Sequence, residues 1–325
     1  MARFLARRLL NYIVLLFVAV TAAYFLAATQ LHPRQLYEVS NPPIPVESIN
    51  KSLDAYNLND HEPVIDRYFD WLGDVVHGDW GRAPKGASVN DEISARIWVS
   101  IRLVTIGSVL GVIIGVILGA WTATRQYRLS DRITTFWSLI IISTPVLVLA
   151  VVMKLLATKF NQFFDSGFFE FTGETGRHAP GRINAWGDRF QHLLLPTITL
   201  AFAGIATYSR IQRNIMLDTL GADYVRTAQA KGLTRRQAVF KHALRTALIP
   251  TGTYFAFTIA LLFIGAAITE TIYSWRGMGV YGVSTIAGQD TNGVVAVVAF
   301  TGVCVLVGGF LSDVFVAILD PRVRQ

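Results

Sequence analysis

The chain has 325 residues, of which 52% are hydrophobic and only 16% are charged, and its mean hydropathy is +0.43. This composition is too apolar for an ordinary soluble domain and indicates an integral membrane protein. The formal net charge is +7. Nucleic-acid binding would require aromatic residues interleaved with the basic ones on a soluble face, so we attribute this charge to membrane topology instead.

Each of six apolar segments has roughly the 20 residues that a helix needs to cross a bilayer. We therefore predict an all-α integral membrane protein with six transmembrane helices. Residues 1–31 are interpreted as an N-terminal tail and a first helix rather than a secretory signal, because the apolar stretch has no polar cleavage region. The predicted spans are Leu9–Thr29, Leu103–Ala123, Thr134–Leu156, Leu193–Ser209, Leu248–Ile272 and Val294–Leu319.

Three prolines fall within these segments. Pro145 lies in the third span, Pro196 lies in the fourth, and Pro250 opens the fifth. Because proline lacks an amide N–H and clashes with the preceding turn, we expect it to kink or end a helix at each position.

The distribution of Lys and Arg predicts the orientation in the membrane. With the N-terminus inside, the inner segments hold sixteen of the 29 basic residues and few acidic ones, whereas the outer segments are richer in acids. Basic side chains resist translocation, so both termini are predicted to be cytoplasmic.

Residues 32–99 form a large predicted extracytoplasmic segment, and residues 100–325 form a core of five spans with a cytoplasmic loop at 210–247. The outer segment contains tryptophans and acids, as in Asp66–Asp74 and His77–Arg82. We expect it to fold against the outer membrane face. It acts either as a passive cap or as a docking surface for an extracytoplasmic partner, since aromatic and Arg residues suit both roles.

Glycine recurs at every fourth position of the second span. Small residues on one stripe let a neighbouring helix backbone approach closely in lipid. This pattern predicts that one face of the helix is buried in protein, with a neighbour in this chain or in another subunit. The four residues are Gly107, Gly111, Gly115 and Gly119.

Several functions are disfavoured by what the spans and loops contain. Charged residues within the spans are few and lie near their ends, whereas ion- or proton-driven carriers usually place them near the midplane. None of the six lysines follows a glycine, so the chain has no P-loop, and its histidines show no metal-ligand spacing. We therefore expect no catalytic residue, metal or cofactor in this chain.

The basic stretch Asp223–Arg245 predicts two short helices on the cytoplasmic side. Asp223 is a candidate N-cap for the first helix, Gly232 is suited to end it in a left-handed conformation, and Thr234 with Gln237 forms a capping box for the second. In the second helix the spacing predicts a buried stripe of Val239, Phe240, Ala243, Leu244 and Ala247. The alternative is an amphipathic helix lying on anionic lipid.

The stretch Ala228-Gln-Ala-Lys-Gly232, followed by Leu233, resembles the EAA loop of the membrane permeases of binding-protein-dependent ATP-binding-cassette importers, in the dipeptide, oligopeptide and nickel branch. Arg226 and Thr227 replace the Glu and Ala of the motif's name, which matches the peptide branch. His32-Pro-Arg departs from the family pattern after the first span. Further similar stretches are His77–Arg82, His192–Pro196, Glu270–Gly279 and Leu319–Arg324.

The resemblance implies a type I importer permease fold in the cell membrane. It implies a second homologous permease chain, two ATPase subunits or domains that bind the ATP and Mg, and an extracytoplasmic substrate-binding protein. It also implies alternating access, in which Asp223, Arg226, Ala228, Gly232 and Leu233 couple this chain to the ATPases.

Glu270, Thr271 and Trp275 would lie near the outer mouth of the path, where Glu270 either gates transport or only caps a helix end. Peptide is the expected cargo, oligopeptide before dipeptide, and nickel is disfavoured because no His, Cys or Met cluster lines the spans. An ion-driven secondary carrier and a membrane scaffold without transport remain the competing classes.

Overall fold

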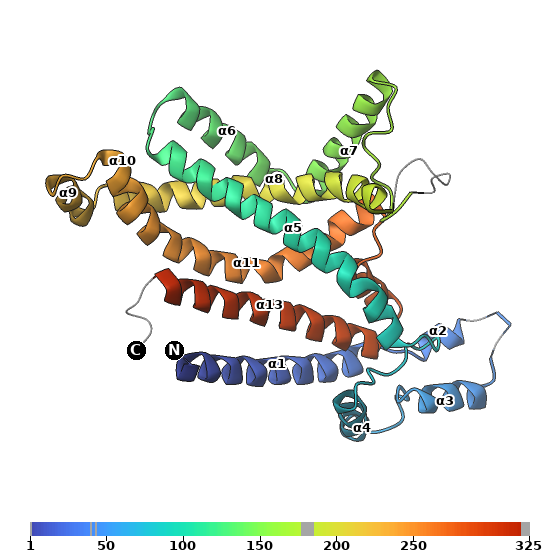
Figure 1. The fold of residues 1–325 in the computed structure, drawn as a ribbon. Coiled ribbons are helices and arrows are strands. Elements are labelled where there is room, and N and C mark those ends of the chain that lie inside the picture. Colours follow the sequence, from blue (N-terminus) through green and yellow to red (C-terminus); the bar gives the residue numbers. More distant parts are fainter. Residues whose placement is uncertain (1, 40, 43, 177–184, 320–325) are drawn as a thin grey trace. The chain divides into compact units, whose positions relative to one another are not determined.

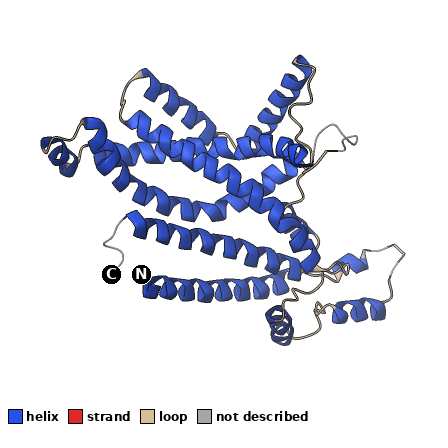
Figure 2. Ribbon diagram, viewed as in Figure 1, coloured by secondary structure: helices blue, strands red, loops and turns tan. Residues whose placement is uncertain are grey.

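The computed structural model describes residues 2–39, 41–42, 44–176 and 185–319, without the side chains of 2–5, 185 and 256–265. Every regular element in this part of the chain is a helix (Figures 1 and 2), and the described strand pairing is a single isolated bridge between Arg82 and Ser88. The elements are α1 (Ala2–Gln30), α2 (Gln35–Glu38), α3 (Val46–Ala55), α4 (Val64–Val76), α5 (Val89–Ala123), α6 (Leu129–Ser143), α7 (Val146–Phe163), α8 (Ala185–Leu220), α9 (Asp223–Ala230), α10 (Arg235–Ala238), the π-helix η1 (Val239–Ala243), α11 (Leu244–Tyr273), α12 (Met278–Ala287) and α13 (Thr291–Leu319).

The chain forms two compact units. The core unit consists of Ile101–Trp275 and Val307–Gln325, with Met1–Leu5, and the N-terminal unit consists of Ala6–Ser100 and Arg276–Leu306. Helices α5 and α13, and the first residues of α1, are therefore divided between the units.

Within the described residues, five helices are long and apolar enough to span a membrane, namely α1, α5, α7, α8 and α13. Helix α11 has 30 residues and contains the predicted fifth span, Leu248–Ile272, although the side chains in its middle lie outside the described ones. An all-helical membrane architecture is thus confirmed.

The third predicted span, Thr134–Leu156, is wrong as a single helix. Helix α6 ends at Ser143 and α7 begins at Val146, with Thr144 in an extended conformation between them. The cause is Pro145, whose ring disfavours the helical conformation of the residue before it. Pro196 and Pro250, in contrast, lie inside α8 and α11 without ending either helix.

In the core unit, α8 is the central helix. It packs against α6, α7 and α11, and α11 also packs against α7. Figure 1 shows α9 and α10 near the C-terminal end of α8, and α7 near its N-terminal end. Within the core unit, the predicted cytoplasmic loop and the segment that follows α7, which the predicted topology places outside, thus lie toward opposite ends of α8.

In the N-terminal unit, the segment predicted to be extracytoplasmic is folded into short amphipathic helices around an aromatic core. The ring centroids of Tyr24 and Trp71 are 4.8 Å apart, and the hydroxyls of Thr21 and Tyr68 are 2.8 Å apart. Val295 completes the same cluster. Burial of these large rings ties α4 to α1 and to the start of α13.

Candidate functional site

The first helix of the basic stretch, α9, ends in a glycine turn. The amide of Gly232 donates to the carbonyl of Gln229 at 2.9 Å, and the amide of Leu233 donates to that of Ala228 at 3.2 Å. This pair of bonds is the Schellman motif, which needs a left-handed residue just after the helix. Gly232 adopts φ +93°, so glycine is favoured there.

The second helix begins with a reciprocal capping box. The hydroxyl of Thr234 accepts a hydrogen bond from the amide of Gln237 at 3.3 Å, and the side-chain carbonyl of Gln237 accepts one from the amide of Thr234 at 3.0 Å. Two amides that a helix start leaves without partners are thereby satisfied. The turn between α9 and α10 is therefore defined on both sides by local hydrogen bonds.

A small apolar core holds these two helices on the ends of α5 and α8. Val225 and Ala228 of α9 are buried in it, together with Met216 of α8 and Ala123 of α5. The apolar face of the pair is thus covered by the chain itself, which argues against a helix lying on lipid. The remaining buried residues of this core are Ala238, Val239, Ala243 and Ala247.

Two details of the predicted pair of helices are wrong. Asp223 is the first residue of α9 rather than its N-cap, a position that Ala222 occupies without a side-chain hydrogen bond. A carboxylate in the first turn still complements the helix dipole. Phe240 is 61% exposed, because the buried residues of this stretch, Val239 and Ala243 of η1 and Ala247 of α11, follow one another at intervals of four and Phe240 lies off that line.

The five residues expected to couple to an ATPase divide into two groups. Asp223, Arg226 and Gly232 are exposed, whereas Ala228 is buried and Leu233 packs against the apolar core. A Cβ added at Gly232 would have no atom within 4 Å. The exposed surface combines basic residues with two aromatic rings. It is formed by Tyr224, Arg226, Lys231, Arg235, Arg236, Phe240 and Lys241.

Sequence reasoning missed an ion pair close to this surface. Arg213 of α8 donates from Nε and Nη2 to the two carboxylate oxygens of Asp131, at 2.5 and 2.8 Å, and the amide of Tyr127 donates to Asp131 at 2.9 Å. The hydrogen bonds from Arg213 lower the pKa of Asp131. This fork ties the turn between α5 and α6 to α8. The two residues are 82 apart in sequence, so no local pattern indicates the pair.

The glycine stripe on α5 lies against α8 of the same chain. A Cβ at Gly111 would come within 3.0 Å of the Cα of Gly204, and one at Gly115 within 2.8 Å of the Cβ of Tyr208. Gly107 faces Leu200 in the same way, and Gly119 faces the backbone of Ser209. Because real Cβ atoms do not approach so closely, any larger residue on the stripe must push the two helices apart.

The three residues expected near the outer mouth lie at the C-terminal end of α11. The amide of Trp275 donates to the carbonyl of Glu270 at 2.7 Å, across Ser274 in the left-handed region at φ +58°. Glu270 is fully buried and Trp275 is 3% exposed, whereas Thr271 is exposed and donates its hydroxyl to the carbonyl of Ala267. Glu270 and Trp275 are thus held together inside the core unit, and Thr271 points elsewhere.

Comparison with known proteins agrees with this architecture. The profile of the family "binding-protein-dependent transport system inner membrane component" matches residues 111–325. The chain is 47% identical to the oligopeptide transport system permease protein OppB of Mycobacterium tuberculosis, over all of this chain and 99% of that protein. It is 32% identical to the oligopeptide permease AppB of Bacillus subtilis and 31% identical to the dipeptide permease DppB of Lactococcus lactis, over the full length of both chains.

The matching profile covers more than half of the chain, and these relatives align with it from end to end. The description of the family places such proteins in the inner membrane, in keeping with the apolar helices found here. This chain therefore belongs to the family of binding-protein-dependent transport system inner membrane components and is a multi-pass protein of the cell membrane.

Proposed function

We propose that this chain is the transmembrane permease subunit of an ATP-driven importer that carries peptides into the cytoplasm by alternating access. The observation that carries this proposal is the exposed glycine turn at Gly232, built on the ends of α5 and α8 by a buried apolar core. A carrier driven by an ion gradient has no need for an external turn on which a second protein acts, and neither has a passive scaffold. In this proposal the turn is the lever through which the ATPase moves the permease.

The contacts supply a route by which a movement of this turn reaches the far end of the core unit. Displacement of α9 acts on α8 through Val225 and Met216, and the Asp131–Arg213 ion pair carries α6 along with α8. Along the glycine stripe, α5 and α8 are packed too closely for one helix to shift without the other. Closure of an ATPase pair would thus rotate the bundle as a body.

Near the middle of α8, a hydrogen-bond chain links three helices. The hydroxyls of Thr199 and Tyr273 are 2.8 Å apart, and Tyr273 also donates to the carbonyl of Ala150 in α7 at 3.3 Å. Movement of α8 is therefore transmitted to the end of α11. We assign Glu270 and Trp275, which flank Tyr273, to the outer gate of the path.

The partners follow from the proposed mechanism. The permease requires a second homologous permease chain to complete the path, two ATPase subunits or domains that bind ATP and Mg, and an extracytoplasmic binding protein. This chain itself binds no nucleotide in the proposal. Oligopeptides are the first choice of cargo because the 47% identical relatives are named for oligopeptide transport, and dipeptides are the second.

The test is ATP-dependent peptide uptake by proteoliposomes that contain the complete complex, with Gly232→Trp compared against Gly78→Trp. Gly78 is a matched control, since it has φ +91° and its added Cβ would also find no atom within 4 Å. We expect Gly232→Trp to abolish uptake and co-purification of the ATPase, and Gly78→Trp to retain the ATPase. If Gly232→Trp leaves both uptake and ATPase association unchanged, the turn is not the lever.

A further inference from the structure

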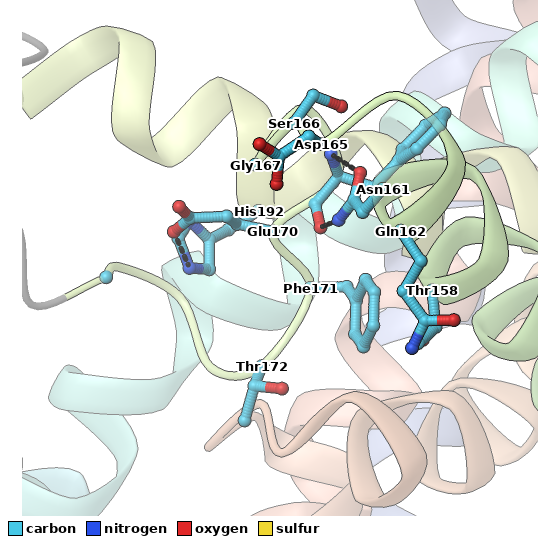
Figure 3. Close-up of a pocket in the computed structure, with 12 residues that line it drawn as sticks. Thr158, Asn161, Gln162, Asp165, Ser166, Gly167, Glu170, Phe171, Thr172 and His192 are labelled. Carbon is cyan, nitrogen blue, oxygen red and sulfur yellow. Dashed lines mark hydrogen bonds and ion pairs between the residues drawn. The ribbon is translucent and has the colours of Figure 1, made fainter.

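A cavity of about 670 Å³ opens at the N-terminal end of α8, far from the proposed lever. Its walls come from the end of α7, the segment 165–176 and the first turns of α8, and Figure 3 shows Glu170 and His192 side by side at one edge. Other lining residues are Asn161, Asp165, Phe171 and Thr172. The cavity lies on the predicted extracytoplasmic side.

Three potential metal ligands converge at this edge. Asp188 and His192 are four residues apart on α8 and therefore share one face of the helix, and Glu170 approaches from the preceding segment. One ligand atom from each residue can be chosen so that all three lie within 4.8 Å of one another. Among the described residues this is the one group of three or more such side chains that meets this criterion.

The separation between His192 and Glu170 is better suited to a shared metal ion than to a hydrogen bond. The Nε2 atom of His192 lies 3.6 Å from Oε2 of Glu170, which is too far for a hydrogen bond. Two ligands that each lie about 2.1 Å from a tetrahedral ion are about 3.4 Å apart. Small side-chain adjustments therefore bring both atoms to bonding distance of one ion.

The tautomer of His192 also favours metal binding. Its Nδ1 lies 2.9 Å from the main-chain carbonyl of Asp188, and since a carbonyl can only accept, Nδ1 must be the donor. In the neutral ring, the lone pair of Nε2 is then directed toward Glu170 and the cavity, while the side chain is only 3% exposed. A backbone carbonyl that orients the second ring nitrogen is the usual support of a metal-binding histidine.

The carboxylate of Asp188 is held in place as well. The amide of Gly176 donates to its two oxygens, at 3.0 and 3.2 Å, and Oδ1 lies 3.4 Å from Nδ1 of His192. Its side chain is about 10% exposed, whereas that of Glu170 is about one-third exposed. Asp188 is thus fixed on α8 next to His192, and Glu170 can close on an ion from the side of the cavity.

We propose that Glu170, Asp188 and His192 form a binding site for a divalent transition-metal ion. One imidazole and two carboxylates form a mixed nitrogen and oxygen set that suits Zn²⁺ and similar ions of borderline softness. The ion would link the segment after α7 to the start of α8, with its remaining coordination positions open to the cavity. This site is independent of the glycine turn and of the proposed transport cycle.

The experiment measures Zn²⁺ binding to the full-length chain, purified in its complex and treated with a chelator, by competition with a chromophoric indicator and by metal analysis. His192→Gln is the test variant. His77→Gln is the matched control, because Nδ1 of His77 likewise lies 2.7 Å from the carbonyl four residues earlier, that of Gly73, but His77 belongs to no such cluster in the described part of the chain.

We expect saturable binding of one Zn²⁺ per chain that His77→Gln retains and that His192→Gln weakens by at least about tenfold. Visible d–d absorption of Co²⁺ in the wild type, lost in His192→Gln, would show direct ligation. If His192→Gln does not fold, Glu170→Gln is the test variant, because it keeps the side-chain volume at a partly exposed position. It should likewise weaken Zn²⁺ binding. The proposal fails if the wild type binds no Zn²⁺ above the level of the variants, because the three groups then form only an ion-pair cluster.

Discussion

Two helices of the core unit end in the same backbone turn, and the two turns have different surroundings. After α9, the Schellman bonds cross Gly232 at φ +93°, in a place where an added Cβ meets no atom. After α11, equivalent bonds cross Ser274 at φ +58°, between the buried residues Tyr273 and Trp275. One turn is exposed at the surface, and the other is enclosed by buried residues inside the fold.

This difference shows that a local motif does not by itself indicate a function. Both turns satisfy the last carbonyls of a helix in the same way. The residues around each turn, and not the turn itself, determine whether it is exposed at the surface or enclosed in the core. The predictions below test that difference.

The largest effect is expected from Trp275→Ala. The indole is 3% exposed, so its removal leaves a cavity and should lower the free energy of unfolding by about 3–5 kcal/mol. Tyr224→Ala, at a 43% exposed ring in the first turn of α9, should change stability by less than about 0.5 kcal/mol and weaken ATPase association instead. Thermal unfolding of the detergent-purified chain compares the two. Equal destabilisation by both would remove the distinction between the turns.

The next largest effect is expected from Asp131→Asn, which removes a charged acceptor from Arg213. A loss of about 2–3 kcal/mol is expected at pH 7, less than for a fully buried pair because Arg213 is partly exposed. Folding lowers the pKa of Asp131, so its stabilisation is present above the unfolded pKa and is lost as the pH falls through the folded pKa. The difference between wild type and variant in thermal unfolding should therefore shrink in strong acid. Asp218→Asn, at an exposed position on α8, is the control and should have almost no effect.

Gly232→Val against Gly232→Asn tests the backbone of the exposed turn. Both side chains have room, but valine resists the left-handed conformation, at a cost of about 1–2 kcal/mol, whereas asparagine tolerates it. We expect the valine variant to reduce peptide-stimulated ATP hydrolysis by the complex more than the asparagine variant does. If both variants are equally impaired, side-chain bulk at the interface, and not the turn conformation, sets the coupling.

The smallest effect is expected from Ser274→Gly, which gives the enclosed turn the residue found in the exposed one. Relief of strain at φ +58° is partly offset by the greater freedom of glycine in the unfolded chain, so the gain should be about 0–1 kcal/mol. Transport should be unchanged. A clear loss of uptake in Ser274→Gly, at normal thermal stability, would show that the proposed gate needs the more restricted backbone of serine at this turn.

The features that could be predicted were those set by composition or by residues close in sequence. The apolar segments indicated a helical membrane protein because a bilayer demands about 20 apolar residues per span. The left-handed turn at Gly232 and the Thr234–Gln237 capping box were predicted because their hydrogen bonds join residues a few positions apart. Each of three prolines was expected to kink or end a helix, and one helix does end before Pro145, whereas Pro196 and Pro250 lie inside α8 and α11 without ending them.

The amino-acid sequence by itself thus determined the helical membrane class and the local shape of the exposed turn, because these depend on composition and on short-range hydrogen bonds, and its short motifs indicated the family. Only the tertiary structure decided which helix the glycine stripe of α5 faces, that Asp131 pairs with Arg213, and that Glu170 approaches His192. It also decided that Phe240 is exposed and Ala228 buried. Such outcomes depend on how distant segments pack against one another, which local spacing does not specify.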